Sequence, residues 1–113
     1  MEVLSRDKVA EIRRLNDQFR TTFRGGQIVL TQSVADLPDM VKAAALCEVQ
    51  KFSAFTEKND PTNEHDFLAF ELCNRCFIFS IVYFDLKLEH GSPDPADPNV
   101  TRRIGTLMMA HDW

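Results

Sequence analysis

The beginning of the chain has the polar and apolar pattern of an amphipathic helix. Apolar residues recur three or four positions apart, with charged residues between them: Val9, Ile12, Leu15 and Phe19. This spacing predicts a helix from about Ser5 to Phe19, with Ser5 as its N-cap. Gly25-Gly26 then turns the chain.

The next segments alternate between strand and helix patterns. Residues 27–34 are rich in apolar and β-branched residues and predict a first strand. Asp36-Leu37-Pro38 has the form of a helix start, with proline close to the first helical position. A stripe from Met40 to Ala45 favours a short second helix. The pattern changes to alternation near Val49–Phe55, which predicts a second strand.

Two apolar runs on either side of residue 75 predict a β-hairpin, with strands at about 64–73 and 76–88. Cys73 and Cys76 flank a tight turn at Asn74-Arg75 in this interpretation. The second strand is apolar on both faces, which is typical of a central, covered strand. The implied register places Glu64 opposite Asp85, with Asp66 beside them on the same face.

A last strand is expected at about 103–110, where Ile104, Leu107, Met108 and Met109 lie. The order is therefore α-β-α-β-β-β-β. We expect an α+β fold with a mostly antiparallel sheet of about five strands and two helices packed on it. The 113 residues suit one domain, 1–113.

Charge and composition narrow the class of protein. The net charge is −4, whereas residues 1–24 carry six basic and four acidic side chains, so the remainder carries −6. Such an acidic body disfavours nucleic acid as a partner. No apolar run is long enough for a membrane span, and the charged start is unlike a secretory signal. These features predict a cytoplasmic protein, in which the three scattered cysteines are thiols and do not form disulfides.

Two long loops are expected beside the acidic end of the hairpin. One runs from Glu57 to Asn63, and the other, from Glu89 to Arg102, contains three prolines that favour an extended path. Loops of this length are usually functional or disordered. We therefore take the acids and this proline-rich loop as a candidate binding site, comprising Glu64, His65, Asp66, Tyr83, Asp85, Asp94, Asp97, Arg102 and Arg103.

Two interpretations of the acidic cluster stay open. Glu64, Asp66 and Asp85, with His65, His90 and Asp94 nearby, have oxygen ligands that suit a hard divalent cation or acid–base catalysis. The favoured interpretation is structural: Arg102 or Arg103 pairs with the carboxylates, and Tyr83 hydrogen-bonds to Asp66. We therefore assign no catalytic residue, metal ligand or cofactor.

Other motifs give weaker indications. Cys73-x-x-Cys76 resembles half of a zinc site, but no second pair completes it, so free thiols are favoured. His65-Asp66 resembles a metal-phosphohydrolase dyad, yet neighbouring strand residues point to opposite faces. Met108-Met109 and Trp113 suit either an adaptable contact surface or simple packing of the last strand.

Several motifs resemble an uncharacterised bacterial family, domain of unknown function 3768. They are Ile12-Arg13, Leu15-Asn16-Asp17, Phe23-Arg24-Gly25-Gly26, Asn59-Asp60-Pro61, Glu64-His65-Asp66-Phe67, Tyr83-Phe84-Asp85, and Gly91 to Pro98 with Thr101 and Arg103. The resemblance covers nearly the whole chain and departs from the family at Cys73 and Cys76. It implies a small bacterial protein of the kind often encoded near plasmid and other mobile-element genes. It implies no reaction or cofactor.

Three functions follow as hypotheses. The favoured one is a non-enzymatic binding protein that acts by protein–protein contact, such as an inhibitor of a host defence complex of the anti-CRISPR or anti-restriction type. The alternative is a metal-dependent hydrolase or nuclease that uses Glu64, Asp66 and Asp85. The least favoured is a nucleic-acid binder that uses the arginines of the first helix, Arg13, Arg14, Arg20 and Arg24.

Overall fold

The computed structural model describes residues 6–113, so the predicted N-cap Ser5 lies outside the described residues. The elements in chain order are α1 (Arg6–Thr22), β1 (Gly26–Leu30), α2 (Gln32–Ala35), α3 (Asp39–Lys51), β2 (Phe67–Leu72), β3 (Arg75–Phe84), β4 (Arg102–Met109) and the 3₁₀ helix η1 (Ala110–Asp112). Within residues 6–113, no helix has both the length and the apolar character that a bilayer span requires.

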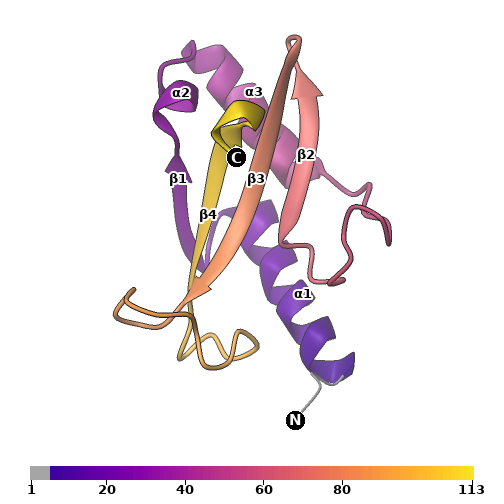
Figure 1. Cartoon of the computed structure of the whole chain (residues 1–113), viewed down its shortest axis with the longest axis vertical. Coiled ribbons are helices and arrows are strands. Elements are labelled where there is room, and N and C mark those ends of the chain that lie inside the picture. The colour runs from indigo at the N-terminus through magenta and orange to yellow at the C-terminus, as the bar shows by residue number, and fades with distance from the viewer. Residues whose placement is uncertain (1–5) are drawn as a thin grey trace.

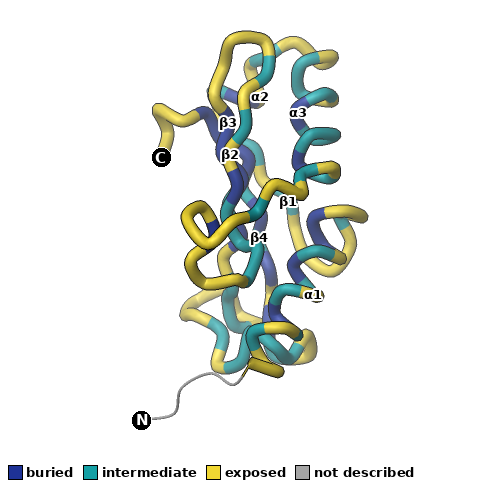
Figure 2. The backbone as a smooth tube through the Cα atoms, turned by 90° about the vertical axis from the view of Figure 1, so that its right-hand side faces the viewer, coloured by how far each residue is buried: buried dark blue, intermediate teal, exposed yellow. Residues whose placement is uncertain are grey.

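The four strands form one mixed sheet in the order β1-β4-β3-β2 (Figure 1). β4 pairs antiparallel with β3 and parallel with β1, while β2 and β3 form an antiparallel hairpin. The helices α1 and α3 lie on the same face of this sheet (Figure 2). The predicted α+β class is therefore confirmed. Within residues 6–113 there are four strands in place of five, three α-helices in place of two, and one parallel pair. The strand predicted at 27–34 ends at Leu30, and the residues after Thr31 form α2.

The core lies between this face of the sheet and the two long helices. Phe19 of α1 packs against Phe79 of β3, with their ring centroids 6.5 Å apart. Gly105 of β4 makes room for both rings, because a Cβ there would lie 2.4 Å from Phe79 Cζ and 3.0 Å from Phe19 Cε2. Phe77, Leu107, Val34 and Val49 are also fully buried in this core.

The second face of the sheet is only partly covered, which corrects the expectation for β3. This strand is central, as predicted, and Ile78 and Met108 are buried on the face away from the helices. Val82, further along β3, is 46% exposed. η1 contacts β3, and Figure 2 shows the chain end on this side of the sheet. The apolar pattern on both sides of β3 therefore reflects a small cover at one end.

The strand predicted at Val49–Phe55 is wrong. Helix α3 continues to Lys51, and the Phe52 N–H donates to the Glu48 carbonyl as its last turn ends. Phe52 and Phe55 then pack edge to face, with ring centroids 4.8 Å apart. The apolar residues of this segment therefore serve a folded loop.

The turn of the hairpin is also displaced from its predicted place. Leu72 pairs with Arg75, so the two turn residues are Cys73 and Asn74, with φ of 52° and 61°. Positive φ at both central residues is typical of the type I′ turn, and asparagine tolerates this conformation better than arginine does. The register therefore differs by two residues from the prediction, and every side chain keeps its predicted face.

This turn generates a prediction about Cys73, which adopts positive φ without the local side-chain hydrogen bonds available to asparagine. The substitution Cys73→Asn is expected to raise the free energy of unfolding by about 0.5–1 kcal/mol. Urea denaturation at a constant m-value would measure the change. The control Cys76→Ser changes an exposed residue of β3 and is expected to have a smaller effect. Equal shifts for both variants would contradict the assignment.

Candidate functional site

A buried amide in α1 connects the helix to both loops at the acidic end of the sheet. The Asn16 side chain is fully buried. Its Nδ2 donates to the Glu64 carbonyl over 2.9 Å and to Tyr83 Oη over 2.7 Å, and its Oδ1 accepts from Arg103 Nε over 2.8 Å. One side chain thus joins α1 to β3, to β4 and to the loop before β2.

Arg103 is the buried cation of this network. Its Nη2 donates to the Pro95 carbonyl over 2.6 Å, and its guanidinium lies 5.1 Å from the centre of the Tyr83 ring. Burial lowers the pKa of Arg103, while the negative charge of Glu64 acts in the opposite direction. Arg103 therefore holds the proline-rich loop through a carbonyl. The expected ion pair of Arg102 or Arg103 with the carboxylates of the cluster is not seen within residues 6–113, because these arginines donate to Asn16 and to backbone carbonyls instead.

Tyr83 and Glu64 complete the network. Tyr83 Oη donates to Glu64 Oε1 over 2.7 Å, which corrects the predicted contact between Tyr83 and Asp66. Burial and the nearby charges of Asp66 and Asp60 raise the pKa of Glu64, although the Tyr83 hydrogen bond lowers it. Burial and the contact with Glu64 also raise the pKa of Tyr83. The Glu64 carboxyl group is therefore a hydrogen-bond acceptor within the protein.

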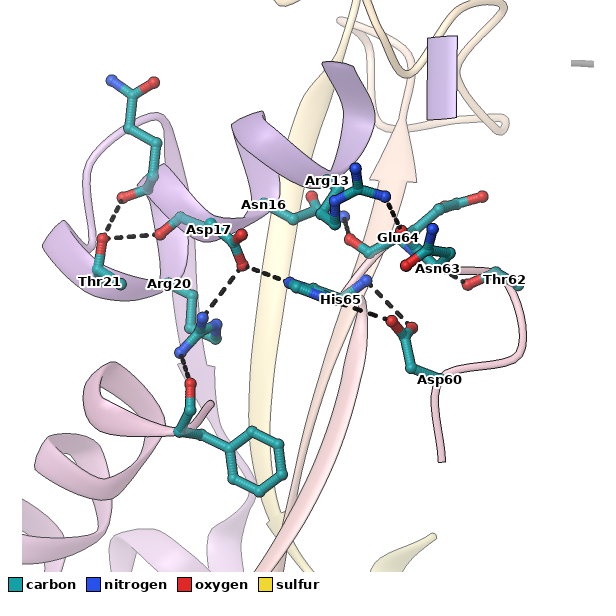
Figure 3. A network of polar contacts seen from close by, with 12 residues as sticks. Arg13, Asn16, Asp17, Arg20, Thr21, Asp60, Thr62, Asn63, Glu64 and His65 are labelled. Carbon is teal, nitrogen blue, oxygen red and sulfur yellow. Dashed lines mark hydrogen bonds and ion pairs between the residues drawn. The ribbon is translucent and has the colours of Figure 1, made fainter. Parts of the chain in front are cut away.

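A second network of polar contacts lies next to the first and includes His65 (Figure 3). His65 Nδ1 is 2.9 Å from Asp17 Oδ1, and its Nε2 is 3.5 Å from Asp60 Oδ2. Asp17 also accepts from Arg20 Nη2 over 3.1 Å. Arg20 in turn donates to the carbonyls of Val49 and Phe52 over 2.9 and 2.8 Å, at the end of α3. This chain of contacts joins both long helices to the loop that precedes β2.

That loop, residues 52–66, is folded around His65. The imidazole stacks on Phe55 with a centroid distance of 3.8 Å and an interplanar angle of 5°. The backbone N–H of His65 donates to Asp60 Oδ1 over 3.1 Å, and His65 has a φ of 57°. A cleft of about 760 Å³ opens beside the ring. It is lined by Phe55, Thr56, Glu57, Asp60, Pro61, Asn63 and His65.

Asp85 does not join the other predicted acids. The hairpin ladder reaches Ile81, whose N–H donates to the Asp66 carbonyl, and beyond it Gly91 pairs with Phe84. Asp85 therefore faces the residues that follow it: its Oδ1 accepts the N–H groups of Lys87 and Glu89. The predicted register of Glu64 with Asp85 is wrong because the chain 85–91 folds back on β3.

The proline-rich loop is held by hydrogen bonds around a buried threonine. Thr101 Oγ1 donates to the Asp94 carbonyl over 2.8 Å and lies 2.6 Å from Ser92 Oγ. The Asp97 carboxylate accepts the N–H of Asn99, within its own turn. Arg102 Nε donates to the Leu86 carbonyl on the exposed side. Asp97 and Arg102 thus stabilise local turns, whereas Arg103 reaches the buried network.

Three of the four arginines named for nucleic-acid binding are buried or contact other residues of the protein. Arg20 is buried, Arg14 pairs with Glu11, and Arg13 Nη1 donates to the Asn63 carbonyl over 3.0 Å. Cys47, Cys73 and Cys76 have free thiols. In the part of the chain that the structure describes, no three His, Cys, Asp or Glu side chains are placed so that they could share a metal ion.

Sequence reasoning did not select Asn16, Asp17 or Asp60 for this site. A signal for Asn16 exists in the spacing, because it lies four residues after Ile12 and three before Phe19, on the buried stripe of the helix. A polar residue in such a stripe needs a buried partner. Asp60, which is 6% exposed, gave no comparable pattern, since it belongs to an irregular loop.

The Asn16 network predicts a large loss of stability on truncation. Asn16→Ala removes all three hydrogen bonds and leaves Arg103 Nε without this acceptor, so the free energy of unfolding is expected to fall by about 3 kcal/mol. Urea denaturation would measure it. Gln18→Ala, on the exposed side of the same helix, is the matched control and is expected to change stability by about 0.5 kcal/mol at most.

The raised pKa of Glu64 predicts a pH-dependent difference between the protein and Glu64→Gln. A raised pKa means that the neutral form stabilises the fold below the unfolded value, and this contribution is lost as pH rises through the folded value. The glutamine stays neutral, so the stability of Glu64→Gln relative to the unchanged protein is expected to increase from pH 4 to pH 7. Urea midpoints across this range would test it.

Asp85→Asn is the control of opposite sign. Hydrogen bonds from backbone N–H groups, that of Glu89 first, lower the pKa of Asp85. Its ionised form stabilises the fold above the unfolded pKa, and this is lost as pH falls. The loss of unfolding free energy caused by Asp85→Asn should therefore grow as pH rises from about 3 to 5. Parallel pH curves for both variants and the unchanged protein would contradict these assignments.

Comparison with known proteins identifies a family without an assigned activity. No curated protein and no solved structure matches the chain. The model of the family described as "Protein of unknown function (DUF3768)" matches residues 30–112, a span that includes loop 52–66, the hairpin, the proline-rich loop and β4. The chain belongs to this DUF3768 family.

Proposed function

We propose that this protein is a small non-enzymatic binding protein that acts by contact with another protein through loop 52–66. The observation that supports this proposal best is the combination of length and order in the loop. Irregular segments of about 15 residues are uncommon in compact domains and are usually functional when they are ordered. Here the loop joins α3 to β2 and is held by many specific contacts.

The order of the loop comes from inward hydrogen bonds. The Thr56 N–H donates to Asn59 Oδ1 over 2.7 Å, and Asn59 Nδ2 donates to the Ala54 carbonyl over 2.9 Å. The Asp60 N–H donates to the Thr56 carbonyl over 2.8 Å. With the contacts of His65 described above, these bonds keep the loop in one conformation. A binding surface that is already ordered loses less entropy when it meets its partner.

The outward surface of the loop is concave and acidic. Residues 52–66 contain four carboxylates and a single lysine, Lys58. The carboxylates of Glu57 and Asp66 lie in the walls of hollows on the surface. The cleft of about 760 Å³ lies on this loop, with exposed Glu57 in its wall. Complementary charge steers the approach of a partner. A basic protein surface suits this loop, and nucleic-acid phosphates do not.

The proposed setting is the bacterial cytoplasm, in the service of a mobile element. Its support is the resemblance to proteins encoded near such elements and an acidic surface that can take the place of phosphates in a basic groove. In this proposal the partner is a host defence complex of the anti-CRISPR or anti-restriction type. Inhibition would then follow from occupation of the basic groove that holds nucleic acid.

Affinity capture from bacterial lysate tests the proposal. The unchanged protein is expected to retain a specific partner, and Glu57→Lys is expected to lose about tenfold or more of it, because the charge in the cleft wall is reversed. Glu89→Lys is the matched control, with the same change of charge at an exposed position of the turn 85–90. Capture is measured by quantitative mass spectrometry.

The outcomes separate clearly. Loss with Glu57→Lys and retention with Glu89→Lys support a binding surface on loop 52–66. Retention of the same proteins by both variants, or the absence of any specific partner, contradicts the proposal. Unfolding curves of the variants should coincide with that of the unchanged protein, because both side chains are exposed.

A further inference from the structure

A second hollow beside the same loop contains an exposed tryptophan. The Trp113 side chain is 71% exposed, although tryptophan buries a large apolar area when it can. Its ring contacts Phe67 edge to face, with centroids 5.0 Å apart and an interplanar angle of 62°. The two rings and loop residues 58–62 line an open pocket of about 440 Å³, with Asp66 in its wall.

The tryptophan is held in place despite its exposure. The backbone N–H of Trp113 donates to the Ala110 carbonyl over 3.2 Å, and this bond continues η1. The neighbouring Asp112 Oδ2 accepts the Met109 N–H over 3.1 Å and Thr31 Oγ1 over 2.9 Å, and it also accepts Ser33 Oγ. η1 is therefore anchored to the start of α2, and the indole is positioned before any ligand arrives.

The lining of the pocket combines aromatic rings with negative charge. The Asp66 carboxylate accepts Thr62 Oγ1 over 3.2 Å, which leaves acceptor capacity on its oxygens. Asp60 also lines the pocket, so two carboxylates lie in its wall. A cation that lies against an aromatic face and beside a carboxylate is stabilised by both.

We propose that this pocket receives a lysine or arginine side chain from the protein partner. The aliphatic stem would lie along Phe67 and Trp113, and the cationic group would reach Asp66. Lys58 lines the same pocket, and its ammonium group opposes an incoming cation. The pocket therefore selects a basic side chain but with an affinity that Lys58 reduces. This inference rests on the protein-binding function proposed above.

The single tryptophan of the chain allows a direct test. The probe is the peptide acetyl-Gly-Arg-Gly-amide, titrated while the indole N–H resonance of Trp113 is followed by NMR. The same peptide with lysine, leucine or glutamate in place of arginine gives the comparison. The arginine and lysine peptides are expected to shift the resonance saturably, and the other two are not.

Four variants define the chemistry of the pocket. Asp66→Asn is expected to weaken binding of the arginine peptide by about fivefold, and Lys58→Ala to strengthen it by about threefold. Glu71→Gln makes the same change of charge as Asp66→Asn, on β2 but outside the pocket, and should leave the affinity unchanged. Rescue of binding by Asp66→Glu would show that the carboxylate, rather than the fold, is responsible.

Several results would overturn the inference. They are the absence of a saturable shift with the basic peptides, an equal or larger shift with the leucine peptide, and equal affinities of the Asp66→Asn and Glu71→Gln variants. Capture from lysate with Asp66→Asn separates the two proposals. A partner retained by this variant but lost with Glu57→Lys overturns the role of the pocket and leaves the binding function supported.

Discussion

The burial of one amide, that of Asn16, determines how the rest of this end of the molecule is arranged. Its three hydrogen bonds reach Glu64, Tyr83 and Arg103, which belong to three different segments of the chain. Each of these groups is costly to bury alone, because an unpaired polar atom in the interior loses its contacts with water. Together they satisfy one another, and the loops on either side of α1 are fixed as a result.

This arrangement also decides which carboxylates face outward. Glu64 accepts a hydrogen bond from Tyr83, and Asp17 and Asp60 both contact the His65 ring. These three acids therefore stabilise the protein itself. Glu57 and Asp66 lie on the walls of the two hollows beside loop 52–66. The internal network and the acidic outer surface are therefore two sides of the same loop, and the order of one supports the other.

The sequence predicted the local elements better than it predicted their relations. The stripe of α1 and the two runs of the hairpin are periodic, and the structure has a helix and two strands there. The hairpin register differed by two residues because the choice of turn depends on which residues tolerate positive φ. Alternate residues of a strand point to opposite faces of the sheet, so a shift of two residues leaves each side chain on the same face. The face of each hairpin residue was therefore predicted correctly, even though Asp85 was placed wrongly.

Other features depend on contacts between distant segments and have no local signal. Phe52 and Phe55 resemble strand residues, yet they pack around His65 in a loop. Asn16 lies on the buried stripe of α1, which marks it as unusual, but its partners were beyond the reach of periodicity. The parallel pairing of β1 with β4 joins Gly26 to Arg103, and no short-range pattern predicts such a pair.

The position of β4 has a consequence for how the molecule is made. This strand lies between β1 and β3, yet it follows both of them in the chain. During translation, β1 and the β2–β3 hairpin therefore leave the ribosome before the strand that joins them. Their facing edges then have open N–H and C=O groups that attract other extended chains. Nascent chains of this protein are therefore open to association with other chains until β4 emerges and pairs with both β1 and β3.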